Sequence, residues 1–130
     1  MPAELVHFDI VGDDVDKLVD FYKHVMGWKV EKYEGEGMGD MVYWEVNPNP
    51  DKEDAVQGGI GKKMMPEQTN INYYTAEGGL EEFNQRVRDR GGTVMMEKMP
   101  VPGWGWFSVC MDPEGNPFAG WVDDKNAKMG

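Results

Sequence analysis

The sequence predicts a small α+β domain built from two pseudo-symmetric βαβββ modules that share one core. Three observations support this prediction. Segments typical of strands and helices follow the order β-α-β-β-β twice, an offset of 65 residues aligns apolar positions of the two halves, and one half alone has too little sheet to close a core. At 130 residues the chain has the length of one domain. We assign residues 1–130 to it, with module one at about 4–65 and module two at about 70–123.

The first half opens with a strand at residues 5–11, where Val6, Phe8 and Ile10 alternate with polar side chains such as His7 and Asp9. Residues 12–14 then supply a turn and an N-cap, and apolar residues recur at helical spacing from Val15 to Met26, before Gly27. A helix of about twelve residues is expected there. Loops rich in glycine, proline and acidic residues separate three further strands, predicted at 28–33, 41–46 and 56–64.

The second half repeats this order. A strand is expected at 70–75 and a helix at 80–90, with strands at 93–96, 104–111 and 118–122, the last two joined by a turn at 112–116. The offset of 65 places His7 on Asn72, Val15 on Leu80 and Gly27 on Gly92. The segment Pro100 to Trp106 is interpreted either as a loop that covers a binding site or as a connector between strands.

Charge and composition exclude several classes of partner. The net charge is −11, so the protein would repel the phosphates of nucleic acids and the headgroups of anionic membranes. No apolar run is long enough to span a membrane, and the N-terminal residues do not resemble a secretory signal. The single cysteine, Cys110, cannot form an intramolecular disulfide. We therefore expect a cytoplasmic protein with no nucleic-acid or membrane partner.

Several segments, taken in order, resemble the vicinal-oxygen-chelate superfamily, which includes glyoxalases, bleomycin-resistance proteins and extradiol dioxygenases. The segments are HFDI, FYKHVMGWKV, VYWEV, GGIG, RGGTV and KMPVPGWGWFSVCMDPEGNPFAGW. The resemblance covers nearly the whole chain. It implies that the modules pair into a curved mixed sheet around a cup, that a small molecule occupies the cup, and that a homodimer is possible.

The resemblance also implies where a divalent metal would bind, because family ligands come from the first and last strand of each module. The matching first-strand positions are His7 and Asn72, and the last-strand positions are Gly58 or Gly59 and Ala119. Only His7 among these is a good ligand for a transition metal. We therefore predict no metal site and no cofactor, although a shift of one or two residues in register would bring in Gln57.

The expected site is a metal-independent pocket for a small organic molecule. We predict five residues as its lining: His7, Trp44, Gln57, Asn72 and Trp106. His7 is also the candidate catalytic residue, because histidine exchanges protons near neutral pH. Its alternative interpretation is a strand histidine hydrogen-bonded inside the fold. Asp9, on the His7 face, and Glu45 are a further candidate acid-base pair, whereas His24 is expected to face solvent at the end of a helix.

Three functional hypotheses remain open. The first is a protein of the glyoxalase and bleomycin-resistance type that binds a small molecule without turning it over. The second is a lyase, isomerase or dioxygenase that depends on a divalent metal, which would polarise a carbonyl group. The third is an enzyme that works through His7 or a carboxylate without metal. Fold resemblance does not decide among them, because one fold supports many chemistries.

Overall fold

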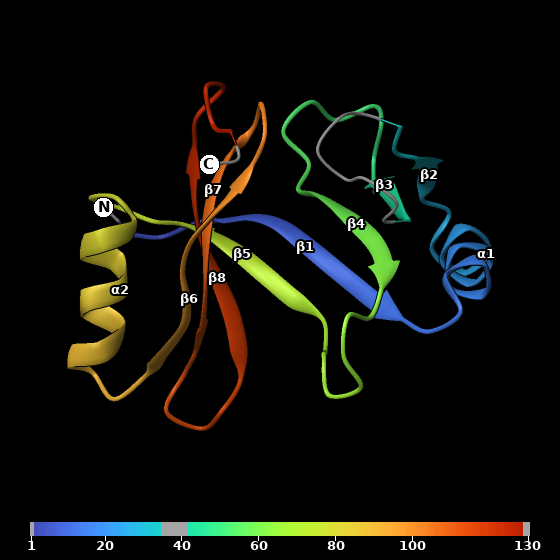
Figure 1. The fold of residues 1–130 in the computed structure, drawn as a ribbon. Coiled ribbons are helices and arrows are strands. Elements are labelled where there is room, and N and C mark those ends of the chain that lie inside the picture. Colours follow the sequence, from blue (N-terminus) through green and yellow to red (C-terminus); the bar gives the residue numbers. More distant parts are fainter. Residues whose placement is uncertain (1, 35–41, 129–130) are drawn as a thin grey trace. The chain divides into compact units, whose positions relative to one another are not determined.

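The computed structural model describes residues 2–34 and 42–128 (Figure 1). The chain forms two compact units, His7–Asn70 and Met1–Val6 with Ile71–Gly130, which we call the first and the second module. Each has one helix and strands in the order β-α-β-β-β, as the sequence predicts, with the first two residues of β1 counted in the second unit. No helix in the described part of the chain is long and apolar enough to cross a membrane.

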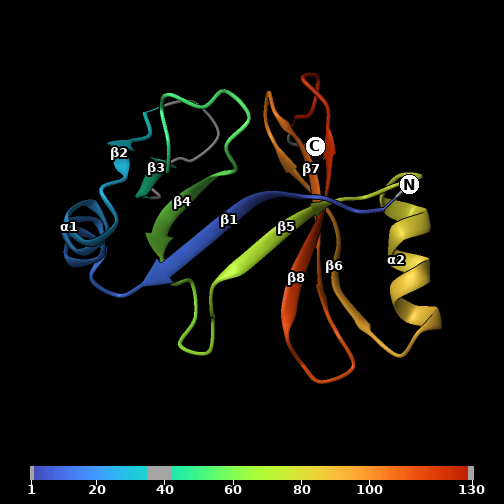
Figure 2. The same cartoon turned by 180° about the vertical axis from the view of Figure 1, so that it is seen from behind.

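The first module is a mixed four-stranded sheet with one helix packed on it. Its elements are β1 (Leu5–Gly12), α1 (Val15–Met26), β2 (Lys29–Lys32), β3 (Tyr43–Asn47) and β4 (Gln57–Lys62). The strand order is β2-β3-β4-β1, in which β1 pairs with β4 in parallel and the other pairs are antiparallel. The ribbons of β1 and β4 run side by side in both views (Figures 1 and 2). The predicted strand start at Met41 lies outside the described residues.

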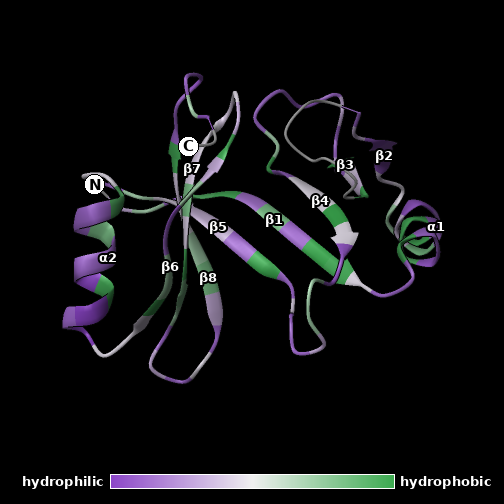
Figure 3. Cartoon of the chain, in the orientation of Figure 1, coloured by the Kyte–Doolittle hydropathy of each residue, from purple (hydrophilic) through white to green (hydrophobic). Residues whose placement is uncertain are grey.

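Helix α1 begins and ends where the sequence predicts. The side chain of Asp14 accepts a hydrogen bond from the backbone N–H of Lys17 at 3.1 Å, which satisfies one of the free donors of the first turn. Gly27 ends the helix in the left-handed conformation, with φ of 69°. The buried face of the helix packs on one face of the sheet, and the core comprises Ile10, Val15, Val19, Val30, Val46 and Ile60. The alternation along β1 is visible as alternating hydrophilic and hydrophobic bands (Figure 3).

Glycine residues on β4 make room for aromatic side chains on both faces of the sheet. On the α1 side, a Cβ at Gly58 would overlap the ring of Phe8, which packs against the core. On the opposite side, a Cβ at Gly59 would overlap the phenol of Tyr43. The first two glycines of the GGIG motif therefore have a packing role, because the rings of Phe8 and Tyr43 fit against β4 only where the strand has no side chain.

The second module has the same plan. Its elements are β5 (Ile71–Thr75), α2 (Leu80–Asp89), β6 (Thr93–Val101), β7 (Gly105–Met111) and β8 (Pro117–Asp123), in the strand order β5-β8-β7-β6. Its core includes Ala76, Leu80, Phe83 and Cys110. Cys110 is fully buried beside Asn84 and Ser108, and burial raises the pKa of its thiol. This cysteine is therefore a structural residue and not a nucleophile.

Strand β6 is longer than the sequence predicts, because it continues beyond Met96 to Val101. Its pairing with β7 shifts register between Val94 and Met96 and again between Met96 and Met99. These irregularities, together with Pro100, interrupt the apolar alternation that would have shown the strand's full length. The predicted loop from Pro100 to Trp106 is accordingly divided between the end of β6, a turn with Gly103 at φ of 83°, and the start of β7. It is a connector between strands.

The 65-residue offset aligns the helices but not the first strands. Val15 and Leu80 both start a helix, yet two residues separate β1 from α1 whereas four separate β5 from α2. Tyr73, and not Asn72, pairs with Ala119, and the Tyr73 ring contacts Phe107 and Trp121 on the face away from α2. Asn72 points to the other side of β5, since side chains alternate along a strand. The mapping of His7 on Asn72 was therefore wrong by one residue. Tyr73 occupies the face equivalent to that of His7, and a shift of one residue moves a side chain to the opposite face of a strand.

Candidate functional site

The face of the first module's sheet opposite α1 carries polar side chains from neighbouring strands. The register of the sheet places His7 beside Gln57, Asp9 beside Gly59, and Gly59 beside Glu45. These residues alternate with the core residues of the same strands, so they lie on the side that α1 does not cover. We call this surface the polar face, comprising His7, Asp9, Glu31, Tyr33, Tyr43, Glu45, Gln57 and Gly59.

Three side chains converge at its centre. His7 Nε2 lies 2.8 Å from Asp9 Oδ1 and 2.9 Å from the hydroxyl of Tyr43, and that hydroxyl donates a hydrogen bond to Asp9 Oδ1 at 2.7 Å. The side chains of His7 and Asp9 are 33% and 22% exposed, so a molecule in solution can reach them. The prediction that Asp9 shares the face of His7 is confirmed.

Asp9 Oδ1 is the atom of this cluster that both other side chains contact. Asp9 Oδ1 accepts the Tyr43 hydroxyl proton, so the short contact from Asp9 Oδ1 to His7 Nε2 is favourable only if Nε2 also carries a proton. Asp9 therefore orients the His7 ring, as carboxylates do for histidines that act in acid-base chemistry.

Tyr43 reaches this cluster because of the glycines of β4. The Tyr43 backbone pairs with Gly61, yet its hydroxyl lies over Gly59 and bonds residues of β1, so the ring crosses the whole width of β4. A Cβ at Gly61 would be at an ordinary contact distance, 3.4 Å from Tyr43 Cδ1. The sequence prediction missed Tyr43. Its position two residues before Glu45, on the same face of β3, and the glycines of GGIG are the signals that could have indicated it.

The other predicted lining residues lie in different places. Gln57 is exposed on the polar face beside His7. The residue of β4 that pairs with His7 is therefore Gln57, and not Gly58 or Gly59, the last-strand positions expected from the family resemblance. Trp44 lies on the opposite face of β3 and packs against the core, with its Nε1 buried and no hydrogen-bond partner among the described residues. Its role in ligand contact stays a prediction.

Asn72 and Trp106 belong to the second module. Asn72 is exposed on β5. Trp106 packs against the core under α2, and its Nε1 donates a hydrogen bond to Asp124 Oδ2 at 2.9 Å. The Lys98 ammonium lies 4.5 Å from the centroid of the Trp106 ring. The Trp106 hydrogen bond, with smaller effects from Asn126 and Lys98, lowers the pKa of Asp124. These contacts explain Trp106 structurally, and its role toward a ligand, like that of Asn72, stays a prediction.

The positions that the resemblance assigns to a metal offer a weak set of donors. His7 and Gln57 are neighbours, but Nε2 of His7 is occupied by Asp9 and Tyr43. In residues 2–34 and 42–128, no three His, Cys, Asp or Glu side chains gather in a group that could hold a metal ion. Asn72 and Ala119 bring no strong donor. This donor set does not fit a transition metal.

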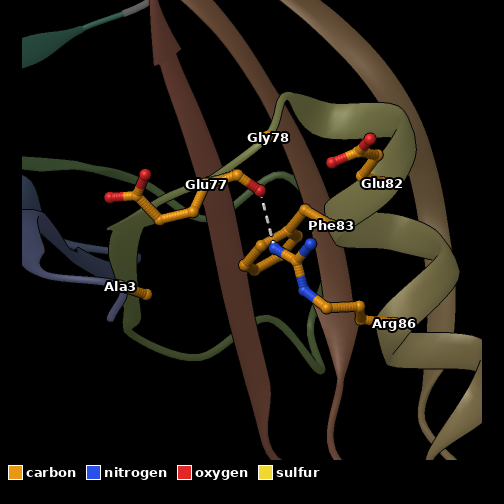
Figure 4. A pocket seen from close by; sticks show the side chains of 6 residues that line it. All are labelled: Ala3, Glu77, Gly78, Glu82, Phe83 and Arg86. Atoms are coloured by element: carbon orange, nitrogen blue, oxygen red, sulfur yellow. Dashed lines mark hydrogen bonds between the residues drawn. The ribbon is translucent and has the colours of Figure 1, made fainter. Parts of the chain in front are cut away.

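A hollow of about 630 Å³ lies beside α2 in the second module (Figure 4). Its lining residues are Ala3, Glu77, Gly78, Glu82, Phe83 and Arg86. Arg86 donates a hydrogen bond from Nη2 to the backbone oxygen of Glu77 at 2.7 Å, and its guanidinium lies 5.9 Å from the centroid of the Phe83 ring. The cation is thus already bound within the fold. No residue predicted from the sequence lines this hollow, and the polar face remains the better candidate.

Comparison with known proteins gives the family. The model of the Glyoxalase/Bleomycin resistance protein/Dioxygenase superfamily matches residues 4–119. The chain belongs to this superfamily. The resemblance inferred from the sequence is therefore confirmed. No curated protein matches the chain in sequence.

Solved structures confirm the βαβββ fold of this superfamily member. Methylmalonyl-CoA epimerase from Mycobacterium tuberculosis is 13% identical, with a TM-score of 0.65 over 92% of this chain and 87% of that one. A hypothetical protein from Bacillus halodurans C-125 is 13% identical, with a TM-score of 0.66 over 99% and 100%. Methylmalonyl-CoA epimerase from Streptomyces coelicolor, in complex with 2-nitronate-propionyl-CoA, is 14% identical, with a TM-score of 0.64 over 97% and 98%. At these identities the likeness concerns the fold.

Proposed function

We propose that this superfamily member binds a small organic molecule on the polar face of the first module, without a metal ion. The observation that carries the proposal is the convergence of His7, Asp9 and Tyr43 from two strands at hydrogen-bond distances. A histidine, a carboxylate and a phenol supply donors and acceptors within one small area, which is the pattern of sites that orient a small ligand. Gln57 adds an amide at the edge of the cluster.

The arrangement favours a binding site over a purely structural network. Tyr43 is held over β4 only because Gly59 has no side chain, and its partners remain partly exposed. A network that served stability alone would gain more from apolar residues, since a partly exposed hydrogen bond contributes little to folding. His7 is the residue we propose for any proton transfer to or from the ligand, with Asp9 as its positioning residue.

The polar face does not suit the CoA esters that are bound in the epimerase structures. CoA esters carry phosphate groups, whereas the polar face bears the carboxylates of Asp9 and Glu45 and the protein has a net charge of −11. Electrostatic repulsion would oppose such a ligand. A small molecule without net negative charge suits the face better.

A library screen monitored by NMR tests the proposal. We expect a bound molecule to shift the amide resonances of β1, β3 and β4, and His7→Ala and Tyr43→Phe to weaken its binding by roughly tenfold, which corresponds to one lost hydrogen bond to a charged group. The matched control is His24→Ala, because His24 is the other histidine and is 76% exposed at the end of α1. Binding that survives both site variants, or that His24→Ala weakens equally, would contradict the proposal.

Metal analysis of the purified protein distinguishes the main alternative, a metal-dependent lyase, isomerase or dioxygenase. We expect far less than one Ni, Zn, Mn or Fe ion per chain after dialysis against each metal, because the one imidazole of the polar face and its carboxylates do not gather, within the described residues, into a group that could hold a metal ion. Near-stoichiometric metal that disappears in His7→Ala would overturn the metal-independent proposal. Metal that persists in His7→Ala would place the ion elsewhere and leave the proposal intact.

A further inference from the structure

The polar face has two aromatic walls beside its hydrogen-bonded centre. The backbone N–H of Tyr33 donates to the carbonyl of Tyr43 at 2.8 Å, so the two tyrosines are neighbours across β2 and β3 on the same face. Their ring centroids lie 6.4 Å apart and their planes meet at 88°. The edge of one ring therefore meets the face of the other, and each ring is electron-rich on its face.

The same face carries negative charge that the fold does not neutralise. Glu45 is exposed, lies directly opposite Glu31 in the β2 and β3 register, and has no ion-pair or hydrogen-bond partner among the described residues. Lys29 neutralises Glu31, with 3.1 Å between Nζ and Oε1, and no other lysine or arginine lies on this face of the four strands. Like charges opposite each other destabilise a strand pair, so folding gives no reason for a carboxylate at Glu45.

We propose that the ligand of the polar face is a small organic cation, an amine or a quaternary ammonium compound. This inference rests on the proposed function and names the ligand class of the same site. The rings of Tyr33 and Tyr43 attract the cation through their faces, as in aromatic sites for ammonium groups. Glu45 on β3 and Asp9 on β1 provide opposite charge on either side of Gly59. The net charge of −11 raises the local concentration of cations and speeds their association.

A pair of matched probes tests the ligand class. Choline and its neutral isostere, in which a tert-butyl group replaces the trimethylammonium group, have nearly the same shape and differ in charge. An NMR titration measures both affinities, with acetate as an anionic probe. We expect choline to bind at least tenfold more tightly than the isostere, as a partly desolvated cation on aromatic rings does at roughly this ratio. Acetate is expected not to bind.

Variants assign the binding to this face. Glu45→Gln and Tyr33→Leu are each expected to weaken choline binding by at least about threefold, because each removes one attractive group. The control is Glu114→Gln, which removes an exposed carboxylate from the turn between β7 and β8 of the second module and is expected to change nothing. If Glu114→Gln weakened choline binding as much as Glu45→Gln, the effect would come from the net charge of the protein and not from this face, and the inference would be refuted.

The outcomes separate this inference from the function it rests on. If the isostere or acetate binds the polar face as tightly as choline, or if Glu45→Gln and Tyr33→Leu leave choline binding unchanged, the cation inference is wrong. The proposed function would then still be supported by a neutral molecule that binds the polar face and whose affinity falls in His7→Ala. If no probe and no library molecule shifts the resonances of β1 and β3, both proposals fail.

Discussion

Alanine in place of Gly59 is expected to reduce ligand affinity at the polar face by at least tenfold. A Cβ at this position would overlap the Tyr43 hydroxyl and Cζ, so the ring must leave β4 and lose its hydrogen bonds with Asp9 and His7. A displaced Tyr43 no longer offers its hydroxyl or its ring to the ligand. One hydrogen bond to a charged group contributes about 1.5–3 kcal/mol, and about 1.4 kcal/mol corresponds to a factor of ten in affinity. NMR titration of Gly59→Ala with a ligand found in the screen measures this loss.

Gly61→Ala is the matched control on the same strand and the same face. Its Cβ would lie 3.4 Å from Tyr43 Cδ1, a distance at which the ring moves by a few tenths of an ångström at most. We expect Gly61→Ala to keep wild-type affinity within about twofold and to fold normally, since alanine fits an extended strand better than glycine by roughly 0.5–1 kcal/mol. Equal loss of affinity in both variants would show that the position of Tyr43 is not what the glycine provides.

Ile60→Ala is expected to lower the free energy of unfolding of the first module by about 2–5 kcal/mol. Ile60 is fully buried at the centre of the sheet, where it pairs with Ile10 on β1 and with Trp44 on β3. The substitution removes three carbon atoms and leaves a cavity that rigid strands on both sides cannot close. Urea unfolding followed by near-ultraviolet circular dichroism reports on this core, because Trp28 and Trp44 pack against it.

The conservative variant Ile60→Val separates cavity formation from a change of fold. It removes one methylene and is expected to cost about 0.5–1.5 kcal/mol with an unchanged dependence on urea concentration. A loss below about 1 kcal/mol for Ile60→Ala would mean that the core around β4 is looser than the packing indicates. Each module has its own core, so the chain need not unfold in one two-state step. The free energy of unfolding of the first module is therefore taken from a signal that reports on that module alone.

Local chemistry determined much of the fold from the sequence. The alternation of Val6, Phe8 and Ile10 identified β1 and its two faces, and Asp14 and Gly27 marked the ends of α1, because capping and periodicity depend on residues close in the chain. The same holds for the turn before β8, where the Asp112 carboxylate accepts hydrogen bonds from the backbone N–H and the side-chain amide of Asn116 and from the backbone N–H of Glu114. These hydrogen bonds lower the pKa of the Asp112 carboxyl. The family followed from the order of such segments.

Irregular strand pairing is the reason why the end of β6 could not be predicted from the sequence. The register shifts of β6 and Pro100 broke the period of two on which strand prediction depends, so the strand seemed to end at Met96. The connection between β5 and α2 is not equivalent to the one between β1 and α1, so the offset taken from the helices is wrong by one residue in the strand, and Asn72 lies on the opposite face from the one expected. Both errors arose because periodicity fixes faces only while the spacing stays regular.

The sequence by itself determined the order of elements and the apolar faces of the helices and strands, and it indicated His7 as a candidate residue, because each depends on residue type and short-range spacing. The expectation of one core shared by both modules was wrong, because each module has its own core cluster. Only the tertiary structure decided which side chains His7 meets. Asp9 is two residues away, but Tyr43 is 36 residues away and reaches His7 across Gly59, and Gln57 became its neighbour through the parallel register of β1 and β4. Contacts between strands depend on register and on the room that a glycine leaves, and no local pattern carries that information.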